Sequence, residues 1–147
     1  MRVIIDASVT MAWCFLDETT PFSESVLDDV RDNGALVPAI WPLEIANTLL
    51  IGERRNRITA AESAAFYDLL KSLPVTVDEQ ALAHAWGSVT NLGRQFSMTA
   101  YDACYVELAV RSSLPVATSD NKLRDVAFRL GIPLSGEAVH AETGRTE

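Results

Sequence analysis

Four acidic residues stand at places in this sequence where a folded chain seldom puts charge. Asp6 and Asp120 each follow a short, mostly apolar run, and Glu44 and Asp102 lie within apolar patterns typical of helices. A carboxylate that loses its water is costly unless it is paired or bound to a metal. Hard divalent cations prefer oxygen ligands and allow neighbouring carboxylates to remain ionised together. The four acids therefore predict a shared site for Mg²⁺, or alternatively Mn²⁺.

Each acid also has an ordinary structural explanation when it is taken alone. Asp6 fits a turn at a strand end, and Asp120 fits a cap for a helix that starts at Asn121. Glu44 and Asp102 fit first-turn acids that the helix dipole favours. These explanations give no reason for two acids to end strands while two others stand early in apolar helices, so the joint pattern favours the metal site.

Nucleophile-based catalysis finds less support in the sequence. Ser8 and Ser119 lack the Gly-x-Ser-x-Gly context of a hydrolase nucleophile. His84 falls in a predicted helix, where a surface or packing role is expected, and His140 falls in the polar C-terminal stretch. Serine- or histidine-centred hydrolysis is therefore disfavoured.

Size and charge narrow the classes of protein. With 147 residues, 48% of them hydrophobic, the chain predicts one soluble globular domain. The net charge of −8 argues against binding nucleic acid by whole-surface attraction, so such binding would need metal ions or a local basic patch. No apolar stretch is long enough to span a bilayer and the start does not resemble a signal peptide, which predicts a cytoplasmic protein without a membrane partner. Cys14 and Cys104 lack metal-ligand spacing and are interpreted as small core residues.

Strands alternate with helices along the chain. Capping and termination signals at Asn33-Gly34, Pro42, Thr59-Glu62, Asp78 and Ser97 or Thr99 place the helix ends. The predicted strands are 2–6, 35–39, 75–77, 115–118 and a short one at 132–134; the predicted helices are 8–16, 23–32, 42–55, 60–73, 78–92, 99–112 and 121–130.

This alternation predicts an α/β domain over residues 1–135 with a mostly parallel sheet, followed by a polar tail at 136–147. Ligands of such sheets bind beyond the carboxyl ends of the strands. Asp6 and Asp120 are expected at that edge.

Four separated segments together resemble PIN-domain ribonucleases, and among these they are most similar to the VapC toxins of bacterial toxin–antitoxin pairs. The resemblance runs in order from the first predicted strand to Leu134. Its segments are Val3-Ile4-Ile5-Asp6-Ala7-Ser8, Trp41-Pro42-Leu43-Glu44-Ile45-Ala46-Asn47, Tyr101-Asp102-Ala103-Cys104-Tyr105-Val106-Glu107-Leu108-Ala109 and Ala117-Thr118-Ser119-Asp120-Asn121-Lys122-Leu123.

The resemblance implies a PIN-like three-layer α/β/α sandwich and a catalytic quartet. Asp6 and Asp102 would be the principal metal ligands, with Glu44 and Asp120 completing the shell directly or through water. The polar side chains expected around the acids are Ser8, Asn47, Thr118 and Ser119. The implied activity is Mg²⁺- or Mn²⁺-dependent RNA cleavage by a homodimer that a VapB-type antitoxin blocks. One or two metal ions would lower the pKa of a bound water and stabilise charge on the phosphate.

Two groups of basic residues are candidates for RNA contact. Arg54, Arg55 and Arg57 end the helix that carries Glu44, and Lys122 and Arg124 follow Asp120. Lysine and arginine commonly position phosphates near such sites. For the arginine group, a solvated helix end that complements the dipole is an equal alternative.

Aromatic and apolar residues allow further interpretations. Trp13, Trp41 and Trp86 are not interleaved with basic residues, so packing in the core or an interface is favoured over base stacking. The predicted helices with residues 49–51 and 64–70 carry more apolar residues than one buried stripe needs. That excess fits a groove for an amphipathic partner helix, or an ordinary helix pair packed on its own core.

Rival functions remain at this stage. A receiver-like signalling domain also gathers acids at strand ends, but it would want several acids after the first strand, where Ala7 and Ser8 stand. A phosphatase with an Asp nucleophile would want a second Asp in place of Ser8. A catalytically inactive PIN-like RNA-binding or scaffolding module is the third alternative, and the intact quartet weighs against it.

Overall fold

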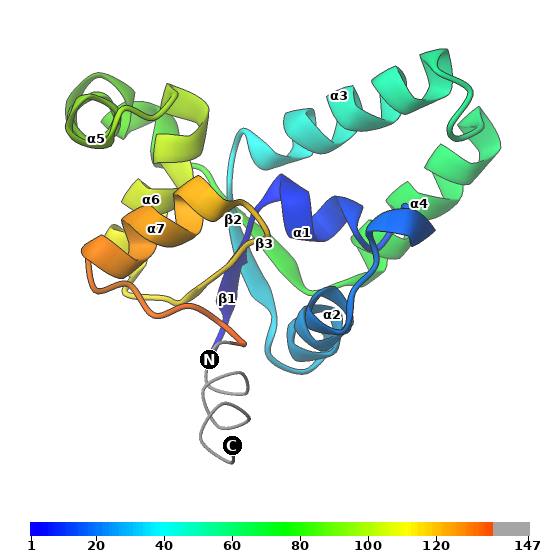
Figure 1. Ribbon diagram of the computed structural model, residues 1–147, viewed down its shortest axis with the longest axis horizontal. Helices are drawn as coiled ribbons and strands as arrows, with labels where there is room; N and C mark the ends of the chain where they lie inside the picture. Colours follow the sequence, from blue (N-terminus) through cyan, green and yellow to red (C-terminus); the bar gives the residue numbers. More distant parts are fainter. Residues whose placement is uncertain (137–147) are drawn as a thin grey trace.

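A four-stranded parallel sheet forms the centre of the molecule in the computed structural model, which describes residues 1–136 (Figure 1). Apart from Gly136, the predicted polar tail lies outside the described residues, as does His140. The strands are β1 (Val3–Ile5), β2 (Ala35–Pro38), β3 (Val75–Asp78) and β4 (Val116–Ala117), in the order β3-β2-β1-β4. The predicted α/β class with a parallel sheet is confirmed.

The order of the strands creates a point where the chain changes direction across the sheet. From β1 the chain moves outward to β2 and β3, and then returns to the other side of β1 as β4. Ile5 pairs with Ala117, so the residues that follow the two strands, Asp6 and Thr118, leave the sheet side by side. Ligands of open parallel sheets bind at such a switch point, beyond the carboxyl ends of the strands.

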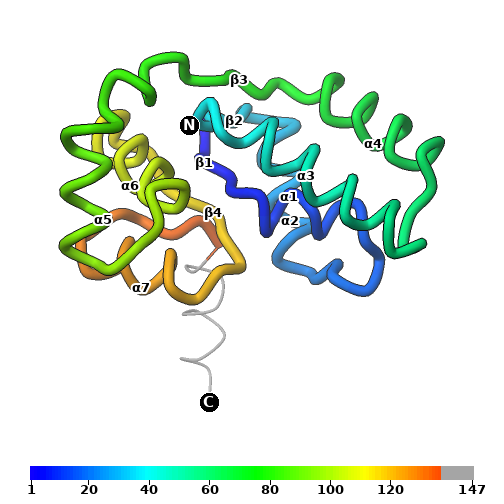
Figure 2. Tube along the Cα trace, turned by 90° about the horizontal axis from the view of Figure 1, so that it is seen from above, coloured from blue at the N-terminus to red at the C-terminus, as the bar shows by residue number. Residues whose placement is uncertain are grey.

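Helices cover both faces of the sheet, which gives the predicted three layers. In Figures 1 and 2 the helices of the first half of the chain lie on one side of the strands and those of the second half on the other. The first group is α1 (Ala7–Met11), α2 (Pro21–Asn33), α3 (Trp41–Arg54) and α4 (Ala60–Ser72); the second is α5 (Thr90–Phe96), α6 (Ala100–Ser112) and α7 (Asn121–Arg129).

Side-chain caps fix the starts of most of these helices. Thr20 and Thr59 each accept a hydrogen bond from a backbone N–H three residues later and complete a capping box. The Thr99 side chain accepts a hydrogen bond from the backbone N–H of Asp102 at the start of α6, so of the two predicted caps Thr99 is the one used. Gly34 ends α2 with φ of +85°, a backbone conformation that favours glycine.

Three predicted elements differ from the structure. The first helix stops at Met11 rather than at residue 16, and a 3₁₀ turn, η1 (Leu16–Glu18), follows. The Thr19 hydroxyl donates to the carbonyl of Ala12 (2.8 Å) and so supports this early end. The predicted strand 132–134 shrinks to one bridge between Val116 and Leu134, because Pro133 has no N–H to donate.

The predicted helix 78–92 is also wrong, because three short segments replace it. A 3₁₀ segment, η2 (Ala81–His84), is followed by a π-helical segment, η3 (Ala85–Val89), and then by α5. Ala81 and Val89 are the only buried residues of η2 and η3, so packing restrains this stretch at few points. Gly87, which is unfavourable inside a helix, stands between them.

The core lies between the sheet and both helical layers and contains two of the three tryptophans. Trp41 is buried and donates to Thr10 Oγ1 (3.1 Å), and Trp13 packs against the core and donates to the carbonyl of Ser23 (2.8 Å). Trp86 does not pack in the core, because 97% of its surface is exposed on η3. Within residues 1–136, no helix has the length and apolar character needed to cross a membrane.

Candidate active site

Asp6 occupies the switch point between β1 and β4 and is almost fully buried, with 6% exposure. Its Oδ1 accepts hydrogen bonds from the Ser8 hydroxyl (2.7 Å) and from the backbone N–H of Val9 (3.1 Å). Its Oδ2 accepts a short hydrogen bond from the Thr118 hydroxyl. Asp6 is therefore the N-cap of α1, and its carboxylate stays buried because neighbouring donors satisfy both oxygens.

Thr118 and Ser8 join the ends of β1 and β4. Thr118 is 1% exposed, and its hydroxyl oxygen also accepts a hydrogen bond from the backbone N–H of Asp120 (2.9 Å). The Ser8 hydroxyl oxygen accepts one from the backbone N–H of Ser119 (3.1 Å). Of the four polar residues predicted around the acids, Ser8 and Thr118 therefore hold Asp6 directly, and Ser119 contacts Ser8 through its backbone.

Glu44 reaches the same region from the first turn of α3. It is half-buried, and its Oε1 accepts a hydrogen bond from the hydroxyl of Tyr105 at 2.5 Å. Tyr105 belongs to α6 and is 2% exposed, so this contact ties α3 to α6 above the sheet.

Asp102 and Asp120 approach from the starts of two other helices. Asp102 lies in the first turn of α6, where its backbone N–H donates to Thr99 Oγ1 (3.1 Å). Asp120 is exposed and caps α7 by accepting from the backbone N–H of Leu123 (2.9 Å). The helix-cap explanation of Asp120 is correct, and it does not remove Asp120 from the group of acids.

Neighbouring negative charges raise the pKa of three of the four acids Asp6, Glu44, Asp102 and Asp120, which we call the acidic cluster. Burial raises the pKa of Asp6, opposed by hydrogen bonds from Thr118 and Ser8, and the charge of Asp120 raises it further. Burial also raises the pKa of Glu44, the Tyr105 hydrogen bond lowers it, and the charges of Asp102 and Asp6 raise it. Each acid is thus within electrostatic reach of at least one other acid of the set.

The pKa of Asp102 is raised as well, in part by the charge of another acid of the set. Burial raises its pKa first, the charge of Asp120 adds to the effect, and the Thr99 hydrogen bond and the charge of Lys122 lower it. Carboxylates that share a site in this way resist ionising together unless positive charge is placed between them. The arrangement favours a bound cation.

The basic residues predicted to contact RNA divide into two groups. Lys122 lies close enough to Asp102 to lower its pKa, and its Nζ donates to the carbonyl of Ser97 (2.7 Å). Arg124 is half-buried on α7. The second group lies at the far end of α3, where Arg54 is ten residues, or roughly 15 Å, from Glu44.

Arg57 is engaged within the protein. Its Nη2 lies 2.7 Å from both carboxylate oxygens of Asp17 and 3.7 Å from Glu18, and its guanidinium stacks 3.9 Å from the centre of the Phe15 ring. Arg54 and Arg55 are exposed. Arg57 is exposed as well, but its guanidinium is bound by Asp17, whereas Arg54 and Arg55 make no ion pair in the described part of the chain.

Asn47 was expected beside the acids and is not hydrogen-bonded to Glu44 in the structure, whereas Tyr105 was not expected there and is. Asn47 is exposed on α3, and among residues 1–136 no hydrogen bond joins it to Glu44. Tyr105, the actual partner of Glu44, was not predicted as a site residue. The signal was present, because Tyr105 follows Asp102 by three residues and shares its helix face.

The donors of the cluster suit a hard divalent cation in type and in charge. In the part of the chain that the structure describes, no three His, Cys, Asp or Glu side chains are grouped closely enough to hold one ion together. Mg²⁺ does not need such a cage, because it usually keeps several waters and binds one or two carboxylates plus substrate phosphates. Asp6, at the switch point where β1 and β4 end side by side, is placed for this mode.

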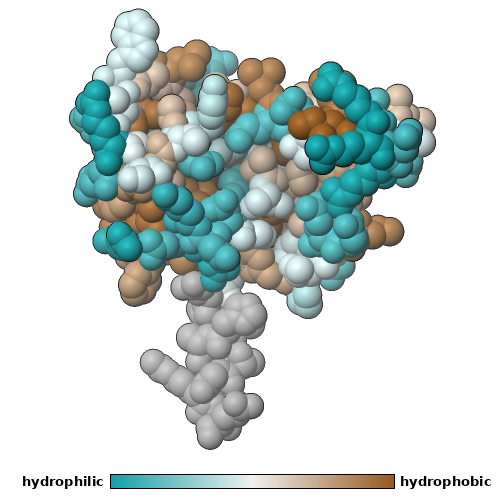
Figure 3. Space-filling view, turned by 45° about the horizontal axis from the view of Figure 1, so that its top comes forward, coloured by the Kyte–Doolittle hydropathy of each residue, from teal (hydrophilic) through white to brown (hydrophobic). Residues whose placement is uncertain are grey.

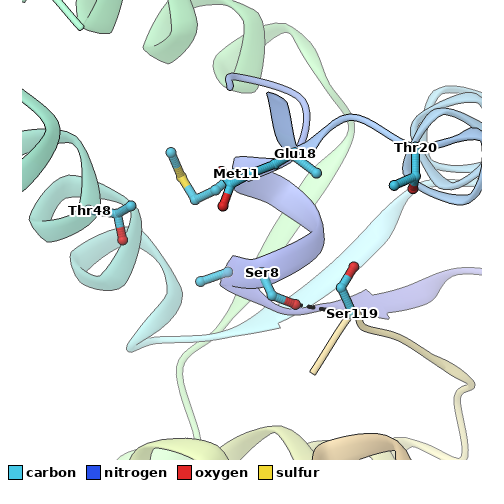
Figure 4. Close-up of a pocket in the computed structure, with 8 residues that line it drawn as sticks. Ser8, Met11, Glu18, Thr20, Thr48 and Ser119 are labelled. Carbon is cyan, nitrogen blue, oxygen red and sulfur yellow. Dashed lines mark hydrogen bonds between the residues drawn. The ribbon is translucent and has the colours of Figure 1, made fainter. Parts of the chain in front are cut away.

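A groove opens beside the acidic cluster, along α1. It has a volume of about 430 Å³ and is lined by residues of α1, by Thr48 of α3, by Ser119, and by Glu18 and Thr20. Figure 4 shows α1 between Thr48 on one side and Thr20 on the other, with Ser8 and Ser119 linked at its start. In Figure 3 hydrophilic and weakly polar surface lies along the hollow between the two groups of helices. Ser8 joins the groove to Asp6.

Comparison with known proteins gives one family and one fold. Residues 3–129 match the PIN domain family. The crystal structure of PAE2754 from Pyrobaculum aerophilum superimposes with a TM-score of 0.64 at 22% sequence identity, covering 86% of this chain and 84% of that one. At this identity the likeness shows a shared fold. No curated protein matches the chain.

Proposed function

The chain belongs to the PIN domain family, and on this basis we propose that it is a cytoplasmic metal-dependent endoribonuclease that acts as the toxin of a VapBC-type toxin–antitoxin pair. PIN domains are generally nucleases and typically use divalent metal ions. Asp6, Glu44, Asp102 and Asp120 are the proposed catalytic residues. The receiver-like and phosphatase alternatives lose their basis, because the family match covers nearly the whole chain.

One observation carries the proposal: four acids gather near the switch point of a parallel sheet, each within electrostatic reach of at least one other. Three of them have raised pKa values, and burial is the largest cause each time. A fold gains no stability from collecting acids in this way, whereas active sites commonly contain such perturbed groups. The cluster is therefore best explained by a cationic ligand and a phosphate-bearing substrate.

Mg²⁺, or Mn²⁺ in its place, is the proposed cofactor. Asp6 and Asp102 would hold it, with Glu44 and Asp120 contributing directly or through water. A divalent ion bound there supplies activation of water and stabilisation of charge on a phosphodiester.

The remaining residues of the site position the carboxylates. Thr118 and Ser8 fix both oxygens of Asp6, so its side chain cannot rotate without losing hydrogen bonds. Tyr105 fixes Glu44 in the same way. Preorganised groups of this kind avoid reorganisation during the reaction. Lys122, beside Asp102, is the basic residue placed to contact an RNA phosphate near the acids. Arg124 on α7, and Arg54 and Arg55 at the end of α3, are further candidates for RNA contact.

The toxin–antitoxin part of the proposal rests on the surface around α3 and α4. Leu43, Leu50 and Ile51 of α3 are 67%, 48% and 37% exposed. An apolar groove of about 220 Å³ lies between α3, α4 and β3, with Trp41 and Tyr67 among its lining residues. Exposed apolar surface of this kind marks sites for protein partners. A cationic, amphipathic antitoxin would complement both this surface and the net charge of −8. A homodimer is proposed as the assembly.

Cleavage of RNA by the purified protein tests the nuclease proposal. Total RNA is incubated with wild type in Mg²⁺, Mn²⁺ or chelator, beside Asp102→Asn and the matched surface control Asp68→Asn, which changes an exposed acid of α4. Wild type and Asp68→Asn should cleave with either metal, and chelator or Asp102→Asn should abolish cleavage. Equal cleavage in every condition would reveal a contaminant and overturn the proposal.

Two further outcomes are informative. Binding of RNA without cleavage, by protein that is folded by circular dichroism, would support the inactive PIN-like RNA-binding module instead. For the toxin role, expression of wild type should arrest bacterial growth, whereas Asp102→Asn should not. Growth that is equal for both would contradict that role. Light scattering on the purified protein tests the homodimer.

A further inference from the structure

We propose that the groove along α1 binds the base of a nucleotide next to the scissile phosphate and that Glu18 makes this subsite prefer guanine. This inference deepens the proposed nuclease function and rests on it for the identity of the substrate. The groove begins at Ser8, whose hydroxyl donates to Asp6, so its contents lie directly beside the acidic cluster. Its volume of about 430 Å³ falls within the range of pockets that bury small organic ligands.

The lining of the groove selects against a phosphate. Glu18 is the only ionisable residue among the eight that line it, and it is negative. The other residues are hydroxyl-bearing or small and apolar, apart from Met11. Among the lining residues a phosphate would meet a carboxylate and no cation, whereas a neutral base would meet a charged hydrogen-bond acceptor. The base and its ribose, rather than the RNA backbone, are therefore the part that fits.

The hydroxyl groups suit a ribose. Thr48 Oγ1 donates to the carbonyl of Glu44 (2.9 Å), which leaves its lone pairs as acceptors. The Ser119 hydroxyl makes no hydrogen bond to the rest of residues 1–136, and it lines the groove next to Ser8. RNA-binding sites use such groups to contact the 2′-hydroxyl, which both donates and accepts.

Glu18 has a carboxylate oxygen available for the base. Arg57 binds both oxygens of Asp17 at 2.7 Å but lies 3.7 Å from Glu18 Oε2, so the guanidinium is held by Asp17. Glu18 Oε1 has no hydrogen-bond partner in the described part of the chain. On unpaired RNA bases proteins read the Watson–Crick edge. Guanine presents two adjacent donors on that edge, N1–H and the 2-amino group, which match Glu18 Oε1 and Oε2, since Arg57 lies beyond hydrogen-bond distance of Oε2.

Methyl NMR of the folded protein tests the groove without requiring catalysis. The chain has three methionines, and Met11 lines the groove while Met1 and Met98 do not. With ¹³C-methyl methionine labelling, guanosine should shift the Met11 signal more than inosine, which lacks the 2-amino group, and more than uridine. The Met11 signal is assigned with Met11→Leu. Glu18→Gln should remove the difference between guanosine and inosine, and Glu24→Gln, an exposed acid of α2, should leave it unchanged.

Cleavage of short RNAs that differ at one base beside the scissile bond provides the second measurement. Wild type should prefer guanine by about five- to 150-fold, the range expected for a bidentate base contact, and Glu18→Gln should lose this preference. Equal Met11 shifts for all nucleosides would overturn the inference. A shift only with N-acetylarginine amide would also overturn it and would assign the groove to a partner's arginine. A guanosine-specific shift without any RNA cleavage would leave the groove in place and refute the nuclease proposal.

Discussion

Replacing Thr118 by valine should destabilise the protein far more than the removal of one exposed hydroxyl group would. Thr118 is 1% exposed, and its hydroxyl donates to the buried Asp6 carboxylate and accepts from the backbone N–H of Asp120. Valine has nearly the same size, so the change removes two hydrogen bonds without creating a large cavity. Asp120 is exposed and its N–H can be hydrated, whereas Asp6 keeps a buried charged oxygen without a donor.

The size of the effect follows from the groups left unpaired. A buried donor or acceptor that loses its partner costs about 1–3 kcal/mol, and more when it is charged, so Thr118→Val should lower the free energy of unfolding by about 2–4 kcal/mol at pH 7. Thr118→Ser keeps both hydrogen bonds and loses one buried methyl group, at about 1 kcal/mol. Serine is therefore the matched control.

The pH dependence has a definite sign. Burial already raises the pKa of Asp6 above its ordinary value of 3.8, and the Thr118 hydrogen bond opposes that rise. In Thr118→Val the folded pKa of Asp6 should rise further. A carboxyl group with a raised folded pKa gives stability that is complete below the unfolded pKa and is lost as the pH rises through the folded pKa. The deficit of the valine variant should therefore be smallest in acid and grow toward neutral pH.

Urea unfolding followed by tryptophan fluorescence, from weakly acidic to neutral pH, measures this deficit. Equal midpoints for the valine and serine variants, or a deficit that is independent of pH, would refute the reasoning. Either result would mean that the hydrogen bond from Thr118 does not determine the ionisation of Asp6.

The remaining predictions concern the binding of Mg²⁺, the ion pair of Arg111 with Glu107, and the ionisation of Glu44. Mg²⁺ at one hundred times its dissociation constant should add about 2.7 kcal/mol to the free energy of unfolding, and Asp6→Asn should abolish this gain in thermal melts. Arg111→Met should cost about 3–5 kcal/mol because it leaves Glu107 and Asp78, with 5% and 12% of their side chains exposed, without their shared arginine; Arg111→Met combined with Glu107→Leu should recover the part due to Glu107 in urea titrations. In the wild type the Tyr105 hydrogen bond lowers the pKa of Glu44, so Tyr105→Phe should raise that pKa and move the acid limb of the pH–rate profile to higher pH. An unmoved limb would exclude Glu44 from catalysis.

The sequence was sufficient to predict the class of fold and the approximate place of the acids. Asp6 and Asp120 follow apolar runs that are real strands, and parallel strands bring their carboxyl ends to one edge. Strong local signals, such as the capping box of Thr59 and Glu62, gave the correct helix start. These features depend on neighbours in sequence, which is why pattern and capping rules identify them.

Features that depend on distant residues were not predictable in the same way. The hydrogen bond from Tyr105 to Glu44 spans 61 residues; helix periodicity places Tyr105 on the face of Asp102 but does not identify it as the partner of Glu44. The exposed state of Trp86 follows from the broken stretch 81–96, where tertiary packing is sparse. Arg57 reads as part of a basic cluster, yet Asp17, forty residues earlier, binds it.

The contact between Thr118 and Asp6, which are 112 residues apart, also determines when the site can exist. A ribosome adds roughly 5–20 residues per second, so Asp6 is made roughly 6–22 s before Thr118. During that interval β1 has no β4 beside it, and Asp6 lacks the donor for one of its two oxygens. Each nascent chain is thus without a complete acidic cluster until synthesis of the domain is nearly finished, and the activity proposed above would be absent from it until then.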